Sequence, residues 1–334
     1  MYLLDESSGW KQRKMTTLKV MVTGASGFVG SALLSRLGVD QGFTPIAAVR
    51  NVESLHGACQ VREFDLCAPS SIPSMRDIDV VVHAAARVHV MNETARDALY
   101  EFRKANLEGT LRLARRAREE GVKRFVFIST IKVNGERTQF KSPFNASDIP
   151  APVDPYSISK YEAELAIREL CDGSEMELVI IRPPLVYGPG VKANFLSMLK
   201  WLDKGLPLPF GALHNQRSLV SVGNLVDLIV VCMSHPAARS QVFLASDGAD
   251  LSTTELLCEL ASAMNKPANL LPVPVFLLKA VGRLLRKEDV VQRICDSLQV
   301  DIKKNRDLLG WTPSIDRATA FRETIIHYKE SKIQ

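Results

Sequence analysis

The chain has 334 residues, enough for a large core and two lobes, and its 42 basic and 37 acidic residues leave a net charge of +5. The basic residues are spread along the chain without a basic block or aromatic–basic interleaving, which argues against a nucleic-acid partner. No segment approaches the ~20 apolar residues that a membrane span requires. The six cysteines show no CxxC or metal-ligand spacing, so we expect a cytoplasmic protein with reduced thiols and no metal site.

The first predicted element is a short strand that contains Val20 and Val22. The polar residues before it (1–15) lack the apolar stretch of a signal peptide and are predicted to form a disordered extension. The sequence GASGFVG follows the strand and opens an amphipathic helix, with glycines at positions 24, 27 and 30. Glycines let the backbone turn tightly and approach a pyrophosphate, whose charge is met by free amides at the helix N-terminus. The pattern predicts a dinucleotide-phosphate turn, and a strand-to-helix turn without a ligand is the alternative.

Strands and helices then alternate along the chain. Strands are predicted at Thr44–Val49, Val80–Ala85, Phe125–Ser129 and Leu178–Ile181, and helices at Ala105–Glu119 and Tyr156–Leu170. This alternation predicts an α/β fold with a doubly wound parallel sheet of the Rossmann type and ligands at the carboxyl ends of the strands. We place a dinucleotide-binding domain at 16–185 plus about 219–247, and a smaller, mostly helical substrate lobe at about 186–218 and 248–334.

One apolar stretch in the smaller lobe has a basic end. Leu270–Lys287 is interrupted by Pro272, Pro274 and Arg283. We interpret it as a helix of the lobe rather than as a membrane anchor.

Tyr156 and Lys160, in the sequence PYSISK, are the candidate catalytic pair. Four residues apart on a helix, they share one face. A free tyrosine has a pKa near ~10 and is a poor acid or base at neutral pH. A lysine cation beside it would favour the phenolate and lower that pKa. A surface tyrosine with a solvated lysine is the alternative for an isolated YxxxK motif.

The end of the second strand bears on the choice of cofactor. NAD-binding proteins of this type place an acidic residue there for the ribose hydroxyls. This chain has Arg50, whose charge suits the extra phosphate of NADP, unless the side chain simply faces solvent. Arg50 therefore favours NADP, with NAD as the second choice, and a reductase that exchanges its spent cofactor.

Together, the motifs GASGFVG, Asp65, HAAA, Asn106, Ser129-Thr130, YxxxK and RPPLVYGPG resemble those of the extended short-chain dehydrogenase/reductase family, in its nucleotide-sugar epimerase/dehydratase branch. The resemblance runs from Leu18 to about Pro313. It implies that Tyr156 is the acid/base, that Lys160 also holds the nicotinamide ribose, and that Thr130 binds the reacting oxygen. It also implies a set of cofactor-binding residues: Gly24, Gly27, Phe28, Val29, Gly30, Arg50, Asp65, Leu66, Ala84, Ala85, Ala86, Asn106, Ser129, Tyr156, Lys160 and Pro183.

Some of these assignments have structural alternatives. Thr130 could cap a strand end, Asn106 could bridge backbone groups, and His83 could be a core histidine. For the substrate, the resemblance offers Asn194 and Arg217 for the diphosphate, with Arg293 as the best candidate for a second arginine. Arg217 could equally be a surface charge.

Two departures from the family pattern narrow the chemistry. Dehydratases of this branch follow the catalytic threonine with an Asp-Glu pair, whereas Ile131 and Lys132 stand here and argue against dehydration. Leu185 occupies a place where many relatives carry asparagine.

The resemblance and Arg50 together favour NADPH-dependent reduction of the 4-keto group of a UDP-linked deoxy-hexosamine for surface polysaccharide (O-antigen) synthesis. An NAD-dependent UDP-hexose 4-epimerase is the first alternative. An NADP-dependent reductase of a non-nucleotide carbonyl compound and a non-catalytic NADP sensor are the others. A homodimer through the helices around 105–119 and 156–170 is a family expectation.

Overall fold

The computed structural model describes residues 17–55, 59–88, 97–139 and 141–332. The disordered extension predicted for residues 1–15 lies outside the described residues.

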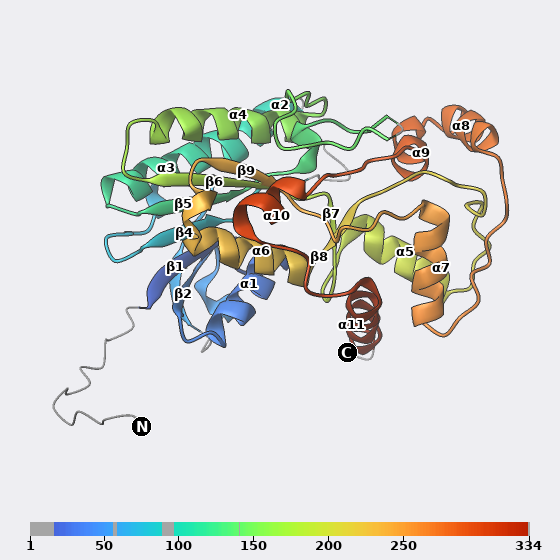
Figure 1. Ribbon diagram of the computed structural model, residues 1–334, viewed down its shortest axis with the longest axis horizontal. Coiled ribbons are helices and arrows are strands. Elements are labelled where there is room, and N and C mark those ends of the chain that lie inside the picture. Colours follow the sequence, from blue (N-terminus) through green and yellow to red (C-terminus); the bar gives the residue numbers. More distant parts are fainter. Residues whose placement is uncertain (1–16, 56–58, 89–96, 140, 333–334) are drawn as a thin grey trace, which may run out of the picture.

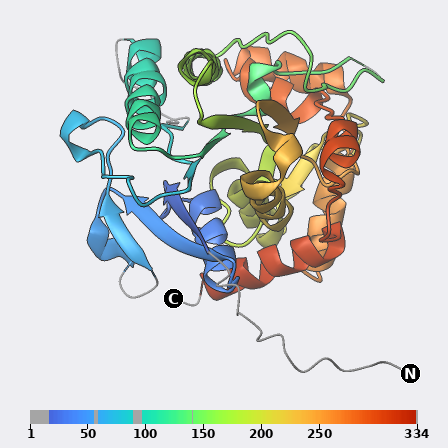
Figure 2. The ribbon, with the colours of Figure 1, turned by 60° about the vertical axis from the view of Figure 1, so that its left-hand side comes forward.

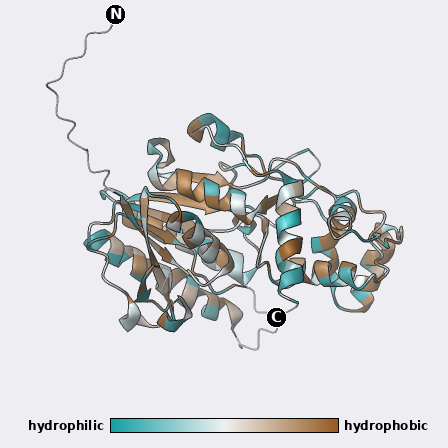
Figure 3. Cartoon of the chain, turned by 90° about the horizontal axis from the view of Figure 1, so that it is seen from below, coloured by the Kyte–Doolittle hydropathy of each residue, from teal (hydrophilic) through white to brown (hydrophobic). Residues whose placement is uncertain are grey.

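The centre of the molecule is a parallel sheet of seven strands in the order β3-β2-β1-β4-β5-β6-β9 (Figure 1). Apart from the edge strand β3, its strands are short, largely apolar runs buried on both faces, as is typical of parallel sheets covered by helices. Figure 3 shows the brown of apolar residues concentrated along them. The strands are β1 (Leu18–Thr23), β2 (Phe43–Val49), β3 (Gln60–Glu63), β4 (Val80–His83), β5 (Arg124–Ile128), β6 (Glu177–Arg182) and β9 (Gln241–Leu244).

Helices cover both faces of this sheet because successive strand residues point to opposite sides. Val20 and Val22 pack in the same cluster as Leu33 of α1 and Leu225 of α6. Met21, between them, packs in the other cluster, with residues of α3 and α4. The helices around the sheet are α1 (Phe28–Gly38), α2 (Ala98–Phe102), α3 (Thr110–Glu119), α4 (Pro155–Cys171), α6 (Val222–Ser234) and α10 (Lys303–Leu309). The predicted doubly wound fold is confirmed.

Short irregular turns join several of these elements. The helix predicted at Ala105–Glu119 begins as a π-helical stretch, η3 (Arg103–Gly109), before α3 continues it. The 3₁₀ turns are η1 (Val52–Leu55), η2 (Pro69–Ser71), η4 (Ile131–Val133) and η5 (Pro236–Ala238).

The smaller part of the molecule is mostly helical and has its own apolar core. Phe195 of α5, Leu257 of α7 and Phe321 of α11 lie in one buried cluster. Its strands are β7 (Leu185–Tyr187) and β8 (Leu219–Ser221), and its helices are α5 (Ala193–Asp203), α7 (Thr253–Ala263), α8 (Val275–Leu284), α9 (Glu288–Cys295) and α11 (Arg317–Glu330). In Figures 1 and 2 the orange helices α8 and α9 lie away from the blue strands β1 and β2. None of the helices formed by the described residues has the length and apolar character needed to cross a membrane.

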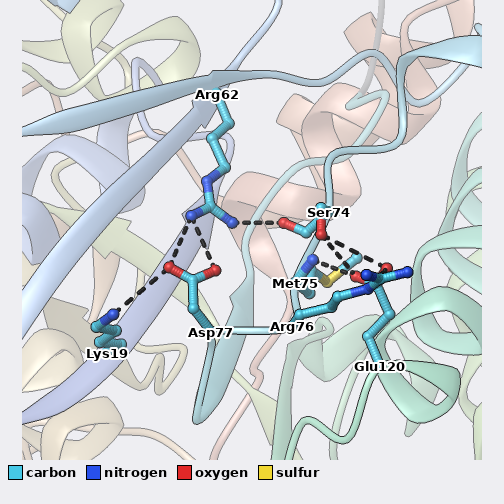
Figure 4. Close-up of polar contacts among 7 residues, drawn as sticks. All are labelled: Lys19, Arg62, Ser74, Met75, Arg76, Asp77 and Glu120. Carbon is cyan, nitrogen blue, oxygen red and sulfur yellow. Dashed lines mark hydrogen bonds and ion pairs between the residues drawn. The ribbon is translucent and has the colours of Figure 1, made fainter.

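Ion pairs fasten the loop that leads into β4, at the amino ends of the strands (Figure 4). Arg62 donates two 3.0 Å hydrogen bonds to the Asp77 carboxylate, and Lys19 lies 3.6 Å from the same carboxylate. Glu120 accepts from the Ser74 hydroxyl at 3.2 Å. Such exposed pairs each contribute little to the stability of the fold. Here they lie at the end of the sheet opposite the predicted ligand site.

Candidate active site

The parallel sheet gathers the predicted cofactor residues at one edge. Because all seven strands run the same way, their carboxyl ends meet there. Each predicted segment follows one of these strand ends or lies in a helix that begins nearby. The glycine turn follows β1, Arg50 follows β2, Asp65 and Leu66 follow β3, Ala84–Ala86 follow β4, Ser129 and Thr130 follow β5, and Pro183 follows β6.

The glycine turn packs too closely for larger residues. Gly24 has a φ of +67°, and a Cβ there would lie 2.7 Å from the backbone nitrogen of Ala85, at the end of β4. A Cβ on Gly30 would lie 2.2 Å from the carbonyl oxygen of Gly24. Helix α1 starts at Phe28 with Gly27 as its N-cap, and the first amides of a helix have no intrahelical acceptor. The amides of Phe28, Val29 and Gly30 can therefore meet a pyrophosphate, so this turn fits the predicted dinucleotide.

The ends of β2 and β3 offer one cation and one carboxylate. Arg50 is exposed and forms no ion pair within the described part of the chain. Asp65 is half-buried, and its Oδ1 accepts a 2.9 Å hydrogen bond from the amide of Cys67. Gly109 packs so closely on Leu66 that a Cβ would lie 2.4 Å from the Leu66 carbonyl oxygen.

Helix α4 carries both members of the predicted catalytic pair in its first two turns. Asp154 caps the helix by accepting from the Ser157 amide at 2.7 Å, and Pro155 occupies its first position. The ring of Tyr156 is half-buried and meets Phe102 edge-on, with 6.0 Å between the ring centroids. Lys160 is only 1% exposed, and its Nζ lies 3.9 Å from the centroid of the Phe127 ring.

The electrostatics of this pair differ from our expectation. Burial, and then the charge of Asp154, raise the pKa of Tyr156 above its ordinary value of 10. Burial lowers the pKa of Lys160 to about 7, although the charge of Glu164 partly opposes that effect. The net shift of the Tyr156 pKa is therefore upward, whereas the motif predicted a downward shift caused by Lys160. Burial in an apolar environment disfavours the charged form of both side chains, so it raises the pKa of the tyrosine and lowers the pKa of the lysine.

Asn106 and Ser159 connect α4 to the loop after β4. The amide of Asn106 both accepts from the Arg87 backbone nitrogen at 2.8 Å and donates to the Arg87 carbonyl at 3.0 Å. Asn106 also donates to the Ser159 hydroxyl at 3.1 Å, which in turn donates to the Tyr156 carbonyl at 2.7 Å. Asn106 does bridge backbone groups, and through Ser159 it positions the segment that carries Tyr156.

The end of β5 is fixed by a buried ion pair. Ser129 donates to Glu164 Oε1 at 2.5 Å, and Arg182 donates to both oxygens of the same carboxylate, at 2.9 and 2.5 Å. Thr130 is buried, and its Oγ1 accepts from the Lys132 amide at 3.3 Å, so it caps the turn η4. Pro183 is buried, and its carbonyl accepts from the Ile131 amide at 2.9 Å.

His83 is a core residue of the sheet. It is fully buried, with its Nδ1 2.6 Å from the Thr23 hydroxyl and its Nε2 2.9 Å from the Thr110 hydroxyl. Burial holds its pKa well below 6.5. Both ring nitrogens are satisfied by threonines, so the core alternative is confirmed for this histidine.

The predicted substrate residues lie in the smaller part of the molecule. Asn194 is exposed in the first turn of α5. Arg217 is half-buried, and its Nη1 donates to the carbonyls of Arg293 and Asp296 at 2.7 and 3.0 Å. The side chain of Arg293 is exposed, so α9 presents a main-chain carbonyl, and not this guanidinium, to Arg217.

Three residues around the pair were not predicted as part of the site. Phe127 lies under the Lys160 ammonium, and Glu164 connects β5 and β6 to α4 through Ser129 and Arg182. Lys132 forms an ion pair with Asp154, the residue that caps α4 and raises the pKa of Tyr156. Only Glu164 had a detectable signal, since it lies one helical turn after Lys160. Among the described residues, no group of three or more His, Cys, Asp or Glu is placed to hold a metal ion.

The doubly wound sheet, the glycine turn and the tyrosine–lysine helix define an enzyme that depends on a nicotinamide dinucleotide. The NAD dependent epimerase/dehydratase family matches residues 20–244, and the chain belongs to this family. It is an NAD(P)-dependent enzyme of the nucleotide-sugar epimerase/dehydratase kind, as the motifs predicted.

Individual relatives agree with this assignment. The chain is 46% identical over 314 residues to a UDP-glucose 4-epimerase from Vibrio cholerae, covering 93% of this chain and 95% of the relative. It is 28% identical to an N-acetyl-α-D-glucosaminyl-diphospho-ditrans,octacis-undecaprenol 4-epimerase from Escherichia coli O157:H7, covering 85% and 88% of the two chains. The crystal structure of UDP-glucose 4-epimerase from Thermotoga maritima with UDP-glucose superposes with a TM-score of 0.76 at 22% identity, covering 94% of this chain and all of the other. That last likeness supports the fold alone.

Proposed function

We propose that this protein is an NAD-dependent UDP-hexose 4-epimerase. The observation that carries the proposal is the 46% identity to the Vibrio cholerae UDP-glucose 4-epimerase over nearly the whole of both chains. The proposal replaces 4-keto reduction, which the family resemblance and Arg50 together favoured from the sequence, because the 46% identity to a 4-epimerase outweighs the single cation at position 50. The tyrosine–lysine helix and the glycine turn suit both reactions.

In this reaction the sugar carbon 4 loses a hydride and its hydroxyl loses a proton, which leaves a 4-keto sugar. A nicotinamide dinucleotide held at the glycine turn would supply the hydride chemistry, as acceptor in the first step and as donor to the opposite face of the rotated keto sugar in the second. Tyr156 takes the hydroxyl proton and gives it back on the return step. Thr130 donates a hydrogen bond to the same oxygen and steadies the negative charge that develops there.

The charges around Tyr156 set how easily it can act as a base. Its pKa is raised by burial and by Asp154. The phenol can therefore act as a base at neutral pH only with positive charge close to its oxygen. Lys132 pairs with Asp154 and reduces the effect of that carboxylate. Lys160, with its pKa near 7, is partly charged at neutral pH and is the second cation of the chain that can act on Tyr156. Lys160 also holds the nicotinamide ribose in this proposal.

The nucleotide diphosphate is assigned to the smaller lobe. Arg217 is rigidly held by two carbonyl groups through a single nitrogen, Nη1, and a guanidinium has five N–H donors in a planar fork. Its other nitrogens can bind phosphate oxygens, with Asn194 at the start of α5 as a second donor. Arg293 is exposed and stays a weaker candidate.

Incubation of the purified enzyme with UDP-glucose tests the proposal. We expect conversion to UDP-galactose without added cofactor, and NAD released by denaturing the protein. Tyr156→Phe should abolish turnover while the bound cofactor is retained, because the phenyl ring keeps its contact with Phe102. Absence of turnover with UDP-hexoses by a wild-type enzyme that retains NAD would falsify the epimerase proposal.

NADPH-dependent reduction of a 4-keto UDP-deoxy-hexosamine remains the second candidate, and exposed Arg50 favours it. Stoichiometric consumption of NADPH with a 4-keto sugar nucleotide would establish it instead.

Roles in surface polysaccharide synthesis, a cytoplasmic location and a homodimer through α3 and α4 are further proposals. Light scattering tests the dimer.

A further inference from the structure

Helix α8 has an apolar face that no other described part of the chain covers. Phe276 is 69% exposed and Leu284 is 82% exposed, and Leu277 and Val281 between them are also exposed. Ala280 is exposed as well. Large apolar side chains gathered on one exposed helix face are typical of an interaction surface.

The opposite face of α8 is the one that packs against the protein. Leu278 and Gly282, four residues apart, are its buried positions. Gly282 lies against α9, where a Cβ would come within 2.6 Å of the Val291 side chain. Since i and i+4 share a helix face, Phe276, Ala280 and Leu284 form a stripe that points away from this contact.

Basic residues border the apolar stripe. Residues 270–295 contain five basic and two acidic residues. Lys279 and Arg283 lie on the helix beside the stripe, within 3.5 Å of Asp296 and 4.0 Å of Glu288 respectively. Arg286 and Lys287 follow at its end, are exposed, and form no ion pair with any residue that the structure describes.

We propose that α8 docks in the interface of an anionic lipid bilayer. The apolar stripe can insert at the boundary of the acyl chains, and the lysine and arginine residues that flank it can contact anionic headgroups. A second copy of this chain is a poorer occupant, because the same face would bring like charges together. The helix has ten residues, about 15 Å at 1.5 Å per residue, so it lies on the membrane and does not cross it. The proposal keeps α8 as a helix of the smaller lobe, as the sequence indicated, and adds a peripheral contact with a membrane surface. It does not depend on the proposed reaction.

Sedimentation of the full-length protein with vesicles tests the proposal. We expect binding to vesicles that contain phosphatidylglycerol and much weaker binding to pure phosphatidylcholine vesicles. The double variant Phe276→Ser/Leu284→Ser should bind roughly ten- to a hundredfold more weakly, from the apolar area it removes. Arg286→Gln/Lys287→Gln should lose roughly fivefold per charge at low salt.

Val39→Ser is the matched control. Val39 is 80% exposed but stands alone after α1, so its replacement should leave vesicle binding unchanged. All variants should keep wild-type melting temperatures and wild-type turnover of soluble UDP-sugars, which separates this proposal from the epimerase proposal. Equal binding by the wild type and the serine double variant would overturn the membrane assignment, as would absence of wild-type binding. Dissociation of an oligomer by the double variant without vesicles would assign the face to a second copy instead.

Discussion

Lys160→Met should stabilise the fold while it removes activity. The ammonium is 1% exposed, and its pKa falls from an ordinary 10.5 to about 7. At ~1.36 kcal/mol per pH unit this corresponds to an electrostatic cost of about 5 kcal/mol for keeping the charge inside the protein. The ammonium also lies 3.9 Å from the centroid of the Phe127 ring, and a methionine side chain can keep an apolar contact with that ring. Methionine has a similar shape without the charge, so we expect a net gain of about 4–5 kcal/mol at pH 6.

The pH dependence of this gain gives the sharper test. Below pH 7 the lysine is charged in both the folded and the unfolded chain, and the full cost is present. Between about 7 and 10.5 the unfolded chain binds more protons, so the stability contributed by this group rises with pH. The advantage of methionine should therefore shrink steadily above pH 7 and vanish near pH 10.5.

Urea unfolding of cofactor-free protein at several pH values measures the effect. Lys104→Met, at an exposed position of η3, is the control and should change stability little at any pH. If Lys160→Met were less stable than the wild type at pH 6, or if the difference did not depend on pH, the reasoning about the buried ammonium would be refuted.

Three further predictions concern the surroundings of the site. Glu164→Gln should lower the free energy of unfolding by about 3–5 kcal/mol, because Arg182 is left buried without its carboxylate. The control Glu162→Gln, in an exposed pair on the same helix, should lower it by less than about 1 kcal/mol. Equal losses in urea titrations would contradict the burial argument. Lys132→Met should move the rise of the pH–rate profile to higher pH, since unpaired Asp154 raises the pKa of Tyr156 further; an unchanged profile would show that this pair does not act on the tyrosine. Arg50→Glu should shift the ratio of NADP to NAD affinity toward NAD in a titration of cofactor-free protein, and an unchanged ratio would remove Arg50 from the cofactor site.

The local patterns of the sequence predicted the scaffold of the site well. The glycine turn, the YxxxK helix and the apolar runs of the sheet are short-range signals, and the structure has them within a few residues of the predicted bounds. The helix at 105–119 was predicted as regular, whereas it begins as a π-helix around Asn106. That distortion arises where Asn106 reaches Arg87 and Ser159, which are distant in the chain.

The electrostatics of the pair could not be predicted in the same way. Spacing shows that Tyr156 and Lys160 share a helix face, but the sign of their pKa shifts depends on what packs around them. Phe127 and Phe102 come from other segments, and the burial of the pair outweighs the attraction that the motif suggests. Arg217 is a similar case, because the carbonyls that hold it lie in α9.

The sequence alone determined the alternation of the main strands and helices, the phosphate turn and the family, because these follow from periodicity and from motifs within a few residues of each other. Only the tertiary structure decided which groups are buried together: Lys160 against Phe127, Glu164 with Arg182, and the uncovered face of α8. Desolvation and ion pairing act through space, over distances that no sequence spacing records, and they set the charges with which this site works.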